Sequence, residues 1–402
     1  MGRLNFYTTE TNYNTSKNSF DYPTVAYVDE TEEVKWMSIQ DKYAREYLTF
    51  EALEDGEFAY TICYGEDAEG GGNVYASAKL QYSFNKEDWF DWAIPNETSE
   101  SINVLANQKL YVRGYTQPLD SAITDYVYGT VKFSSTCRFN VCGLLSSLLY
   151  GYDYTNKEFI WTKQPMKTTH FYGLFDNCDK LISAENLILP QELVRECYSN
   201  MFYGCTSLTT TPELSATTLA GGCYLGMFSD CESLTTAPEL PATTLANDCY
   251  AHMFQGCTSL TKAPELPATT MADNCYEGMF YGCTALTTAP NILPATTLAL
   301  YCYSEMFSGC ISLTTAPILP ATTLEEEGCY QGMFYGCLNL NYIKAMFTTM
   351  RQDSESGEYI CTRGWLRNVA STGTFVKNSA AQWNVSGADG IPTGWTVQTA
   401  SE

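Results

Sequence analysis

The chain has 402 residues and a formal net charge of −24, from 22 Lys and Arg against 46 Asp and Glu. A chain of this length has room for about two or three domains, which excludes a small disulfide-stapled scaffold. The acidic excess would repel phosphate backbones and anionic lipid, so we expect no nucleic-acid partner and no membrane insertion. A hydrophobic content of 45% indicates a folded protein instead of a disordered one.

The amino-terminal segment is polar and rich in Thr, Asn and Tyr. It lacks the apolar run of a signal peptide, so we expect no export signal and, in a reducing compartment, free thiols for the 17 Cys. One strand-like run, Thr24–Val28, lies within residues 1–45. We interpret residues 1–45 as an extended docking arm.

A pattern of alternating apolar residues follows the arm. Leu48, Phe50 and Ala52 form one such run, and Leu80 and Tyr82 belong to another. Period-two alternation in short segments between turns predicts strands, and we expect a β-sandwich-like domain over residues 46–135. Residues 136–170 include an apolar stretch that we predict to cap the next domain.

The segment Cys-Tyr-x-x-Met-Phe-x-x-Cys dominates the rest of the chain. It recurs with a spacing of 26, 26, 26, 27 and 27 residues, and one degenerate copy precedes it, which gives seven units over residues 171–350. The second cysteines of the six full copies are Cys205, Cys231, Cys257, Cys283, Cys310 and Cys337.

Within each unit, apolar residues recur at every fourth position. Leu245, Cys249, Met253 and Cys257 form such a stripe, which predicts a helix of two to three turns that ends at Gly256. The next residues, up to a proline, predict one short strand. Because a single unit cannot bury its stripe, we expect the units to stack into a solenoid with ladders of identical residues.

The repeat ends after residue 350, and residues 351–402 are expected to form a carboxy-terminal cap. Three tryptophans in this segment, Trp365, Trp383 and Trp395, are interpreted as the interior of that cap. A sugar-stacking platform made of the same rings is the alternative.

The motif Met-Phe-x-Gly-Cys-x-x-Leu-x-x-x-Pro resembles the BspA-like leucine-rich repeat. That family occurs in surface proteins of gut bacteria and in their phages, and the chain resembles virion surface or fibre proteins of crAss-like phages. The resemblance implies a right-handed solenoid. The expected fold class is therefore mixed β and α/β, with a β-sandwich-like domain, a leucine-rich-repeat solenoid and a cap.

Few residues are suited to catalysis. Of the two histidines, His170 falls in the repeat register and His252 is expected to face solvent. Serine-hydrolase and zinc-protease motifs are absent, and the Cys spacing is unlike that of structural zinc. We expect no catalytic residue, no metal and no cofactor. A carbohydrate-active enzyme stays as an alternative, with acids and rings from Glu87, Asp88, Trp89, Asp91 and Trp92.

The repeats offer a binding surface instead. Residues 171–350 contain only 4 basic and 17 acidic residues, and the positions that vary between units are expected to be exposed. One variable column consists of Tyr203, Ser229, Gln255, Tyr281, Ser308 and Tyr335. A second column consists of Asn200, Gly226, His252, Gly278, Glu305 and Gly332. The predicted ligand-binding residues are Tyr203, His252, Gln255, Tyr281 and Tyr335.

The sequence therefore predicts a non-enzymatic virion surface protein, a fibre or attachment protein assembled in the host cytoplasm. Its amino-terminal region would dock to other virion proteins, and its solenoid would recognise a host glycan or protein. Fibres are commonly symmetric, so a homo-oligomer is expected. A purely structural capsid or tail decoration and a bacterial adhesin are the alternatives.

Overall fold

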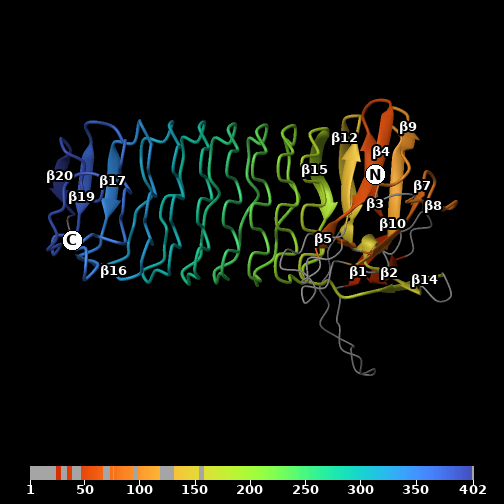
Figure 1. Cartoon of the computed structure of the whole chain (residues 1–402), viewed down its shortest axis with the longest axis horizontal. Helices are drawn as coiled ribbons and strands as arrows, with labels where there is room; N and C mark the ends of the chain where they lie inside the picture. Colours follow the sequence, from red (N-terminus) through yellow and green to blue (C-terminus); the bar gives the residue numbers. More distant parts are fainter. Residues whose placement is uncertain are drawn as a thin grey trace, which may run out of the picture.

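The computed structural model describes residues 24–28, 34–38, 47–66, 73–75, 77–94, 98–117, 131–153 and 158–400. Most of the expected arm lies outside these residues. Within it, β1 (Thr24–Val28) and β2 (Val34–Ser38) pair as an antiparallel hairpin. Figure 1 shows an elongated molecule in which the repeat units stack side by side between a group of sheets and the C terminus.

Two sheets surround the core of the amino-terminal part. Their orders are β15-β12-β3-β10-β7-β8 and β11-β4-β9, and the predicted alternating runs do form strands. The Phe50 ring of one sheet lies 5.0 Å from both Phe58 and Phe133 of the other, between ring centroids. A sandwich-like arrangement stays a prediction. The strands are β3 (Leu48–Ala52), β4 (Gly56–Ile62), β7 (Ser77–Ser83), β8 (Phe90–Trp92), β9 (Ile102–Val104), β10 (Lys109–Gln117), β11 (Val131–Ser135), β12 (Phe139–Leu144) and β15 (Leu181–Ile188).

The remaining elements are short. Among the described residues, the only helix is the 3-10 helix η1 (Leu145–Leu148), so none could span a membrane. The hairpin partners are β5 (Tyr64–Glu66) with β6 (Asn73–Tyr75) and β13 (Tyr150–Asp153) with β14 (Glu158–Lys163).

Each repeat unit contains a run of β-turns that includes its two cysteines. We number the full copies units 1 to 6, so that unit 3 contains Cys257. Its Phe254 N–H donates to the carbonyl of Met279 in unit 4 (2.9 Å), whereas its Met253 N–H donates back to Tyr250 (3.3 Å). Successive backbone N–H groups thus donate alternately to a carbonyl of the next unit and to the carbonyl three residues earlier. In an α-helix, each N–H group would donate to the carbonyl four residues earlier. The helix predicted in each unit is wrong.

No helix forms because every fourth residue of the turn run has a positive φ. In unit 3 these residues are Asp248 (57°), His252 (54°) and Gly256 (70°). A right-handed helix requires negative φ, and Gly, Asn and Asp tolerate the left-handed region best. The turn run also repeats every four residues, so its buried Cys249 and Cys257 imitate a helical stripe. The overlooked signal is the recurrence of residues such as Asn200, Gly204, Gly222, Gly226, Asp230, Asn274, Gly278 and Gly282.

The predicted strand forms in the degenerate first unit, where it is β15, and in the last full unit, where it is β17 (Tyr342–Ala345). In the units between them it is reduced to single bridges. Lys262 bridges in parallel to Thr236 on one side and to Thr288 on the other. Two residues further on, Pro264 has no N–H to continue a ladder. A further short parallel pair joins β16 (Thr323–Leu324) and β18 (Thr349–Met350) near the end of the repeats.

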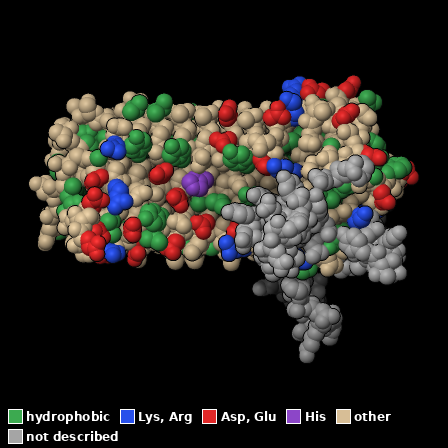
Figure 2. Space-filling view, viewed as in Figure 1, with side chains coloured by type: hydrophobic (Ala, Val, Ile, Leu, Met, Phe, Trp, Pro, Cys, Tyr) green, Lys and Arg blue, Asp and Glu red, His purple; other side chains and the backbone are tan. Residues whose placement is uncertain are grey.

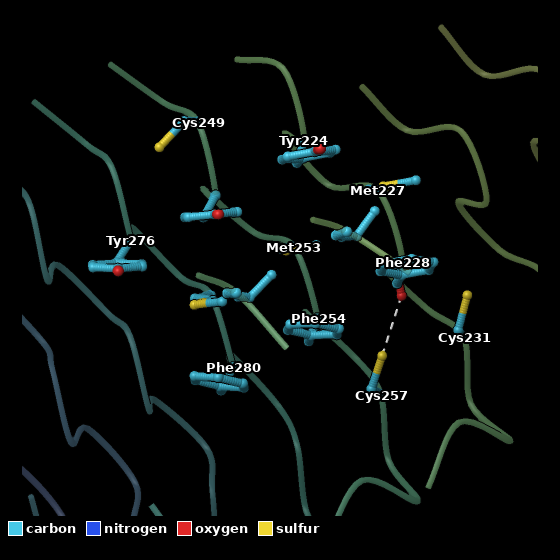
Figure 3. Close-up of a cluster of buried hydrophobic side chains, with 14 of the residues drawn as sticks. Tyr224, Met227, Phe228, Cys231, Cys249, Met253, Phe254, Cys257, Tyr276 and Phe280 are labelled. Carbon is cyan, nitrogen blue, oxygen red and sulfur yellow. Dashed lines mark hydrogen bonds between the residues drawn. The ribbon is translucent and has the colours of Figure 1, made fainter. Parts of the chain in front are cut away.

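Ladders of identical buried side chains fill the interior of the repeats, as predicted. Figure 3 shows successive layers of these side chains. Neighbouring Tyr rings lie 5.8 Å apart and neighbouring Phe rings 5.7 Å apart, with planes 6° to 9° from parallel. These rings belong to Tyr224, Phe228, Tyr250, Phe254, Tyr276 and Phe280. Such stacking gives every layer the same neighbours, so the ladder rigidifies the whole rod.

The second cysteine of each full unit ties its layer to the preceding one. The Cys257 thiol donates to the carbonyl oxygen of Phe228 at 3.1 Å (Figure 3), and Cys283 does the same to Phe254 at 3.1 Å. All 17 cysteines are free thiols. Burial raises the pKa of Cys223, the first cysteine of unit 2, to about 12, so its neutral thiol persists at physiological pH.

The first repeats continue both amino-terminal sheets. Strand β15 pairs in parallel with β12, and the Phe133 N–H of β11 donates to Leu174 at 2.8 Å. The Phe175 ring lies 5.8 Å from Phe133 and 5.5 Å from Phe202. The Phe ladder therefore runs from the sheets into the solenoid, and the hydrophobic core has no break near residue 135.

His170 is buried at this junction. The Thr116 hydroxyl donates to the carbonyl oxygen of Leu148 (2.7 Å) and therefore accepts from His170 Nε2 (2.9 Å). The opposite ring nitrogen, Nδ1, accepts from the Lys167 N–H (3.3 Å). Burial, aided by the Lys167 charge, lowers the pKa of His170 to about 3. The neutral imidazole therefore links the sheet to the first repeat.

We expect this histidine to make the free energy of unfolding decrease as the pH is lowered. In the unfolded chain it binds a proton below about pH 6.5, whereas the folded chain keeps it neutral down to about pH 3. The free energy of unfolding should therefore decline by up to about 1.4 kcal/mol per pH unit below about pH 6.5. Between about pH 7 and about pH 5, the free energy of unfolding measured in urea should fall by about 2 kcal/mol more in the unchanged protein than in His170→Gln. Equal losses in the two proteins would contradict a neutral, buried imidazole at His170.

The stacked layers continue past residue 350, where the sequence predicts that the repeats stop. Strand β17 (Tyr342–Ala345) pairs in parallel with β19 (Thr374–Lys377), which pairs in parallel with β20 (Thr396–Thr399). Tyr330 N–H donates to Cys361 just as Tyr303 N–H donates to Cys329. Degenerate layers therefore build the end of the rod.

The three carboxy-terminal tryptophans lie inside these last layers. Trp365, Trp383 and Trp395 are buried, as expected for an interior position, so the prediction that their rings form a sugar-stacking platform is wrong. Their indole N–H groups donate at 2.7 to 3.0 Å to the carbonyl oxygens of Gly390, Phe347 and Ala370, respectively.

Candidate functional site

The predicted binding column lies in register along the turn runs. Gly282 N–H donates to Ser308 at 2.8 Å, and Gly309 N–H donates to Tyr335 at 2.7 Å. Tyr281, Ser308 and Tyr335 therefore occupy equivalent places in three successive layers. The backbone thus holds the column at a fixed spacing.

Exposure differs along this column. Tyr203, Tyr281 and Tyr335 are 37%, 42% and 43% exposed, whereas Ser229 and Ser308 are 3% exposed. The expectation that every variable position faces solvent is therefore wrong at the serines, because a short side chain between larger neighbours is shielded by them. Figure 2 shows hydrophobic side chains in separate groups on a mainly polar repeat surface, with acidic side chains among them.

Two other predicted site residues are less accessible. Gln255 and His252 are half-buried, and the His252 Nδ1 is buried without a hydrogen-bond partner. A Cβ atom built on Gly278 would lie 2.4 Å from this Nδ1, so the imidazole covers the glycine of the next unit. His252 was expected to face solvent, but its ring lies over Gly278 of the next unit and its Nδ1 is buried.

The column that contains His252 alternates between glycine and larger residues. A Cβ on Gly226 would lie 2.3 Å from Asn200 Oδ1, and one on Gly332 would lie 3.1 Å from Glu305 Cγ. Each large side chain in this column therefore covers the glycine of the following unit. A large residue in one unit requires glycine in the next.

Replacing Gly278 by Ala is expected to destabilise the protein through two effects. The φ of 55° costs about 1–2 kcal/mol for an L-residue, and the new methyl group meets the His252 ring. Removing the ring with His252→Gly should relieve the second effect only. Gly364→Ala is the control, because Gly364 has a φ of 65° and open space around it.

A double-mutant cycle measured by urea unfolding would separate the two effects. Strictly additive changes for Gly278→Ala and His252→Gly would contradict the packing of the ring on the glycine.

Carboxylates lie near the column. Asp230 raises the pKa of Tyr203 through its charge and a hydrogen bond. Burial raises the pKa of Glu277, with an opposing effect of His252 and an additional one from Glu305. Hydroxyl or amine donors on a ligand would find acceptors here, whereas an anionic ligand would be repelled.

Sequence reasoning overlooked two exposed apolar residues beside the column. Ile311 is 40% and Leu338 56% exposed. At the equivalent position other units carry polar residues such as Thr258 and Thr284. The change from a polar to an apolar residue at this position is visible in the sequence, but neither of the two predicted variable columns includes this position.

The described residues do not assemble the alternative catalytic site. Trp92 is buried and donates to Glu100, and the Trp89 ring is covered by the Arg113 guanidinium at 3.8 Å. Asp91 accepts from Gln81. Within the ranges that the structure describes, no group of three or more His, Cys, Asp and Glu could hold a metal ion.

Residues 164–252 and 226–355 match the family model of the BspA type Leucine rich repeat region, in six copies. The repeats are similar to this family. No curated protein matches the chain. A solved leucine-rich repeat protein from Bacteroides ovatus ATCC 8483 is 16% identical, over 68% of this chain and 87% of its own, with a TM-score of 0.23. Leucine-rich repeats generally form binding or scaffold domains.

Proposed function

We propose that this protein is a non-enzymatic virion surface protein, a fibre or attachment protein whose BspA-type solenoid recognises a glycan or protein on the host cell. The observation that carries the proposal is the tyrosine column of Tyr203, Tyr281 and Tyr335. Tyrosine offers a large amphipathic contact area at a low cost in conformational entropy.

The scaffold beneath the column suits recognition. Successive Phe rings, such as those of Phe280 and Phe307 at 5.4 Å, fix the layer spacing below the exposed tyrosines. Because the column is held by backbone bonds between units, little order is lost when a ligand binds. Preorganisation of this kind increases affinity without new contacts.

The virion location rests on the resemblance and on thiol chemistry. The second cysteine of each full unit, such as Cys257, donates a hydrogen bond through its thiol, which requires the reduced form, and a host cytoplasm would supply it. In this proposal the amino-terminal region docks to other virion proteins and the chain forms a homo-oligomer. The acidic charge disfavours nucleic acid and insertion into a membrane.

Binding of the labelled full-length protein to intact gut-bacterial cells tests the recognition role. We expect saturable binding that falls by about tenfold or more when Tyr203, Tyr281 and Tyr335 are all replaced by Ser, the residue of units 2 and 5. Tyr342→Ser is the matched control, because Tyr342 is 37% exposed outside the column. Equal binding by the triple variant would refute the tyrosine column.

The virion location is tested separately by immunogold electron microscopy of phage particles. Gold on the particle surface is expected. Surface label combined with no cell binding would favour the alternative of a purely structural decoration. Label on bacterial envelopes instead would favour an adhesin.

A further inference from the structure

Four exposed apolar side chains gather in the last three full units. Tyr281, Ile311, Tyr335 and Leu338 are 42%, 40%, 43% and 56% exposed. We call them the distal platform, because they lie far from the amino-terminal sheets. In units 1 to 3 the same two columns carry Ser229, Gln255 and polar or acidic residues, apart from Tyr203.

The surroundings of the distal platform are almost uncharged. Over residues 276–289, 303–316 and 329–342, which contain the platform side chains, Glu277 and Glu305 are the only charged residues, in a chain of net charge −24. By contrast, Tyr203 lies against the Asp230 carboxylate. Within these ranges a ligand of the platform therefore meets two carboxylates and no basic side chain. This favours a neutral ligand.

The platform also offers hydrogen-bonding groups between its apolar side chains. Ser312 donates to Thr284 (2.6 Å) and Asn339 donates through Nδ2 to Ile311 (2.8 Å). These donations fix the two side chains and leave the Asn339 Oδ1 as an acceptor. Rigid acceptors beside apolar contact area suit a molecule with both hydroxyl groups and apolar faces.

The layer spacing adds a directional argument. Tyr281 and Tyr335 follow Phe280 and Phe334, whose rings are related by two steps, of 5.4 and 5.6 Å, through Phe307. The two tyrosines thus lie two layers apart, and Ser308 is buried between them. A linear polymer that runs along the rod would meet both rings. Sugar rings have an apolar C–H face for tyrosine and hydroxyl edges for Asn, Ser and carboxylate.

We infer that the distal platform binds an uncharged, extended polysaccharide that lies along the rod axis. This inference rests on the proposed function and assigns its ligand class and its location. Tyr203 and His252, expected in the same site, are not part of it.

The test uses the full-length protein and purified neutral capsular polysaccharide from a gut-bacterial strain that the labelled protein binds. One variant combines Tyr281→Ser with Tyr335→Ser, and another combines Ile311→Thr with Leu338→Thr. Other units carry Ser or Thr at these positions, so the substitutions fit the fold. We expect each pair to weaken binding by about tenfold or more in biolayer interferometry, and Tyr203→Ser by less than about twofold.

The outcomes separate the two levels of the proposal. Equal losses for Tyr203→Ser and the platform variants, or full binding by Ile311→Thr with Leu338→Thr, would overturn the platform. Cell binding that resists periodate but is abolished by protease treatment of the cells would show a protein receptor and overturn the polysaccharide. If the protein bound no cells at all, the proposed function itself would fail.

Discussion

Replacing Phe254 by Ala is expected to lower the free energy of unfolding by about 3–5 kcal/mol. Phe254 is fully buried in the middle of the ladder, and its ring lies 5.7 Å from both Phe228 and Phe280. The substitution removes contacts to both neighbouring layers. Units coupled through nearest neighbours should then unfold less cooperatively. Urea unfolding followed by circular dichroism would measure both the midpoint and the slope.

Phe90→Ala provides the matched control, because Phe90 is 51% exposed on β8. A surface substitution of this kind should change stability by about 0.5 kcal/mol or less. A loss of similar size in both variants would mean that the ladder does not hold the rod together.

Deleting residues 1–135 is expected to produce a chain that aggregates or loses its first layers. The deletion removes β3 and β11, which cover one end of the solenoid core. Phe139, Phe175 and Leu181 are at most 1% exposed in the intact chain and would lose part of their cover. A newly exposed apolar surface at the end of a repeat array is a typical cause of aggregation. Size-exclusion chromatography and thermal unfolding would show the effect.

A chain that starts at residue 47 is the control for this deletion, since it keeps both sheets. It is expected to remain soluble and to melt close to the intact protein. If residues 136–402 alone formed a stable monomer, the continuity of the core across β12 and β15 would not contribute to the stability of the solenoid.

Much of the architecture could be predicted from the sequence. The period of 26 to 27 residues indicates stacked units, and buried residues such as Tyr250, Phe254 and Cys257 do form ladders. The alternating run at Leu48 and Phe50 predicts strand β3. These features depend on side-chain polarity and spacing, which the sequence shows directly.

The local structure of the units could not be read from the same spacing. A four-residue step of apolar positions is shared by a helix and by the turn run, and the two differ in backbone φ at residues such as Asp248 and His252. The recurring Gly, Asn and Asp residues at this step indicate a positive φ, but a His does not. The bonds that stabilise it, such as Tyr250 N–H to Cys275, connect different units.

The binding surface shows the same division. Variation between units led to Tyr203, Tyr281 and Tyr335, and all three are exposed. Exposure of His252 depends on Gly278 in the following unit, and the neighbourhood of Ile311 and Leu338 depends on how the layers align.

By itself, the sequence determined the repeat, its ladders and its acidic, thiol-rich character, because these follow from residue type and period. Only the tertiary structure decided that turns replace helices, that the core continues into the amino-terminal sheets and that degenerate layers extend past residue 350. Each of these depends on hydrogen bonds and packing between residues about 25 or more positions apart, such as Phe133 with Leu174 and Tyr330 with Cys361, and no local pattern encodes such contacts.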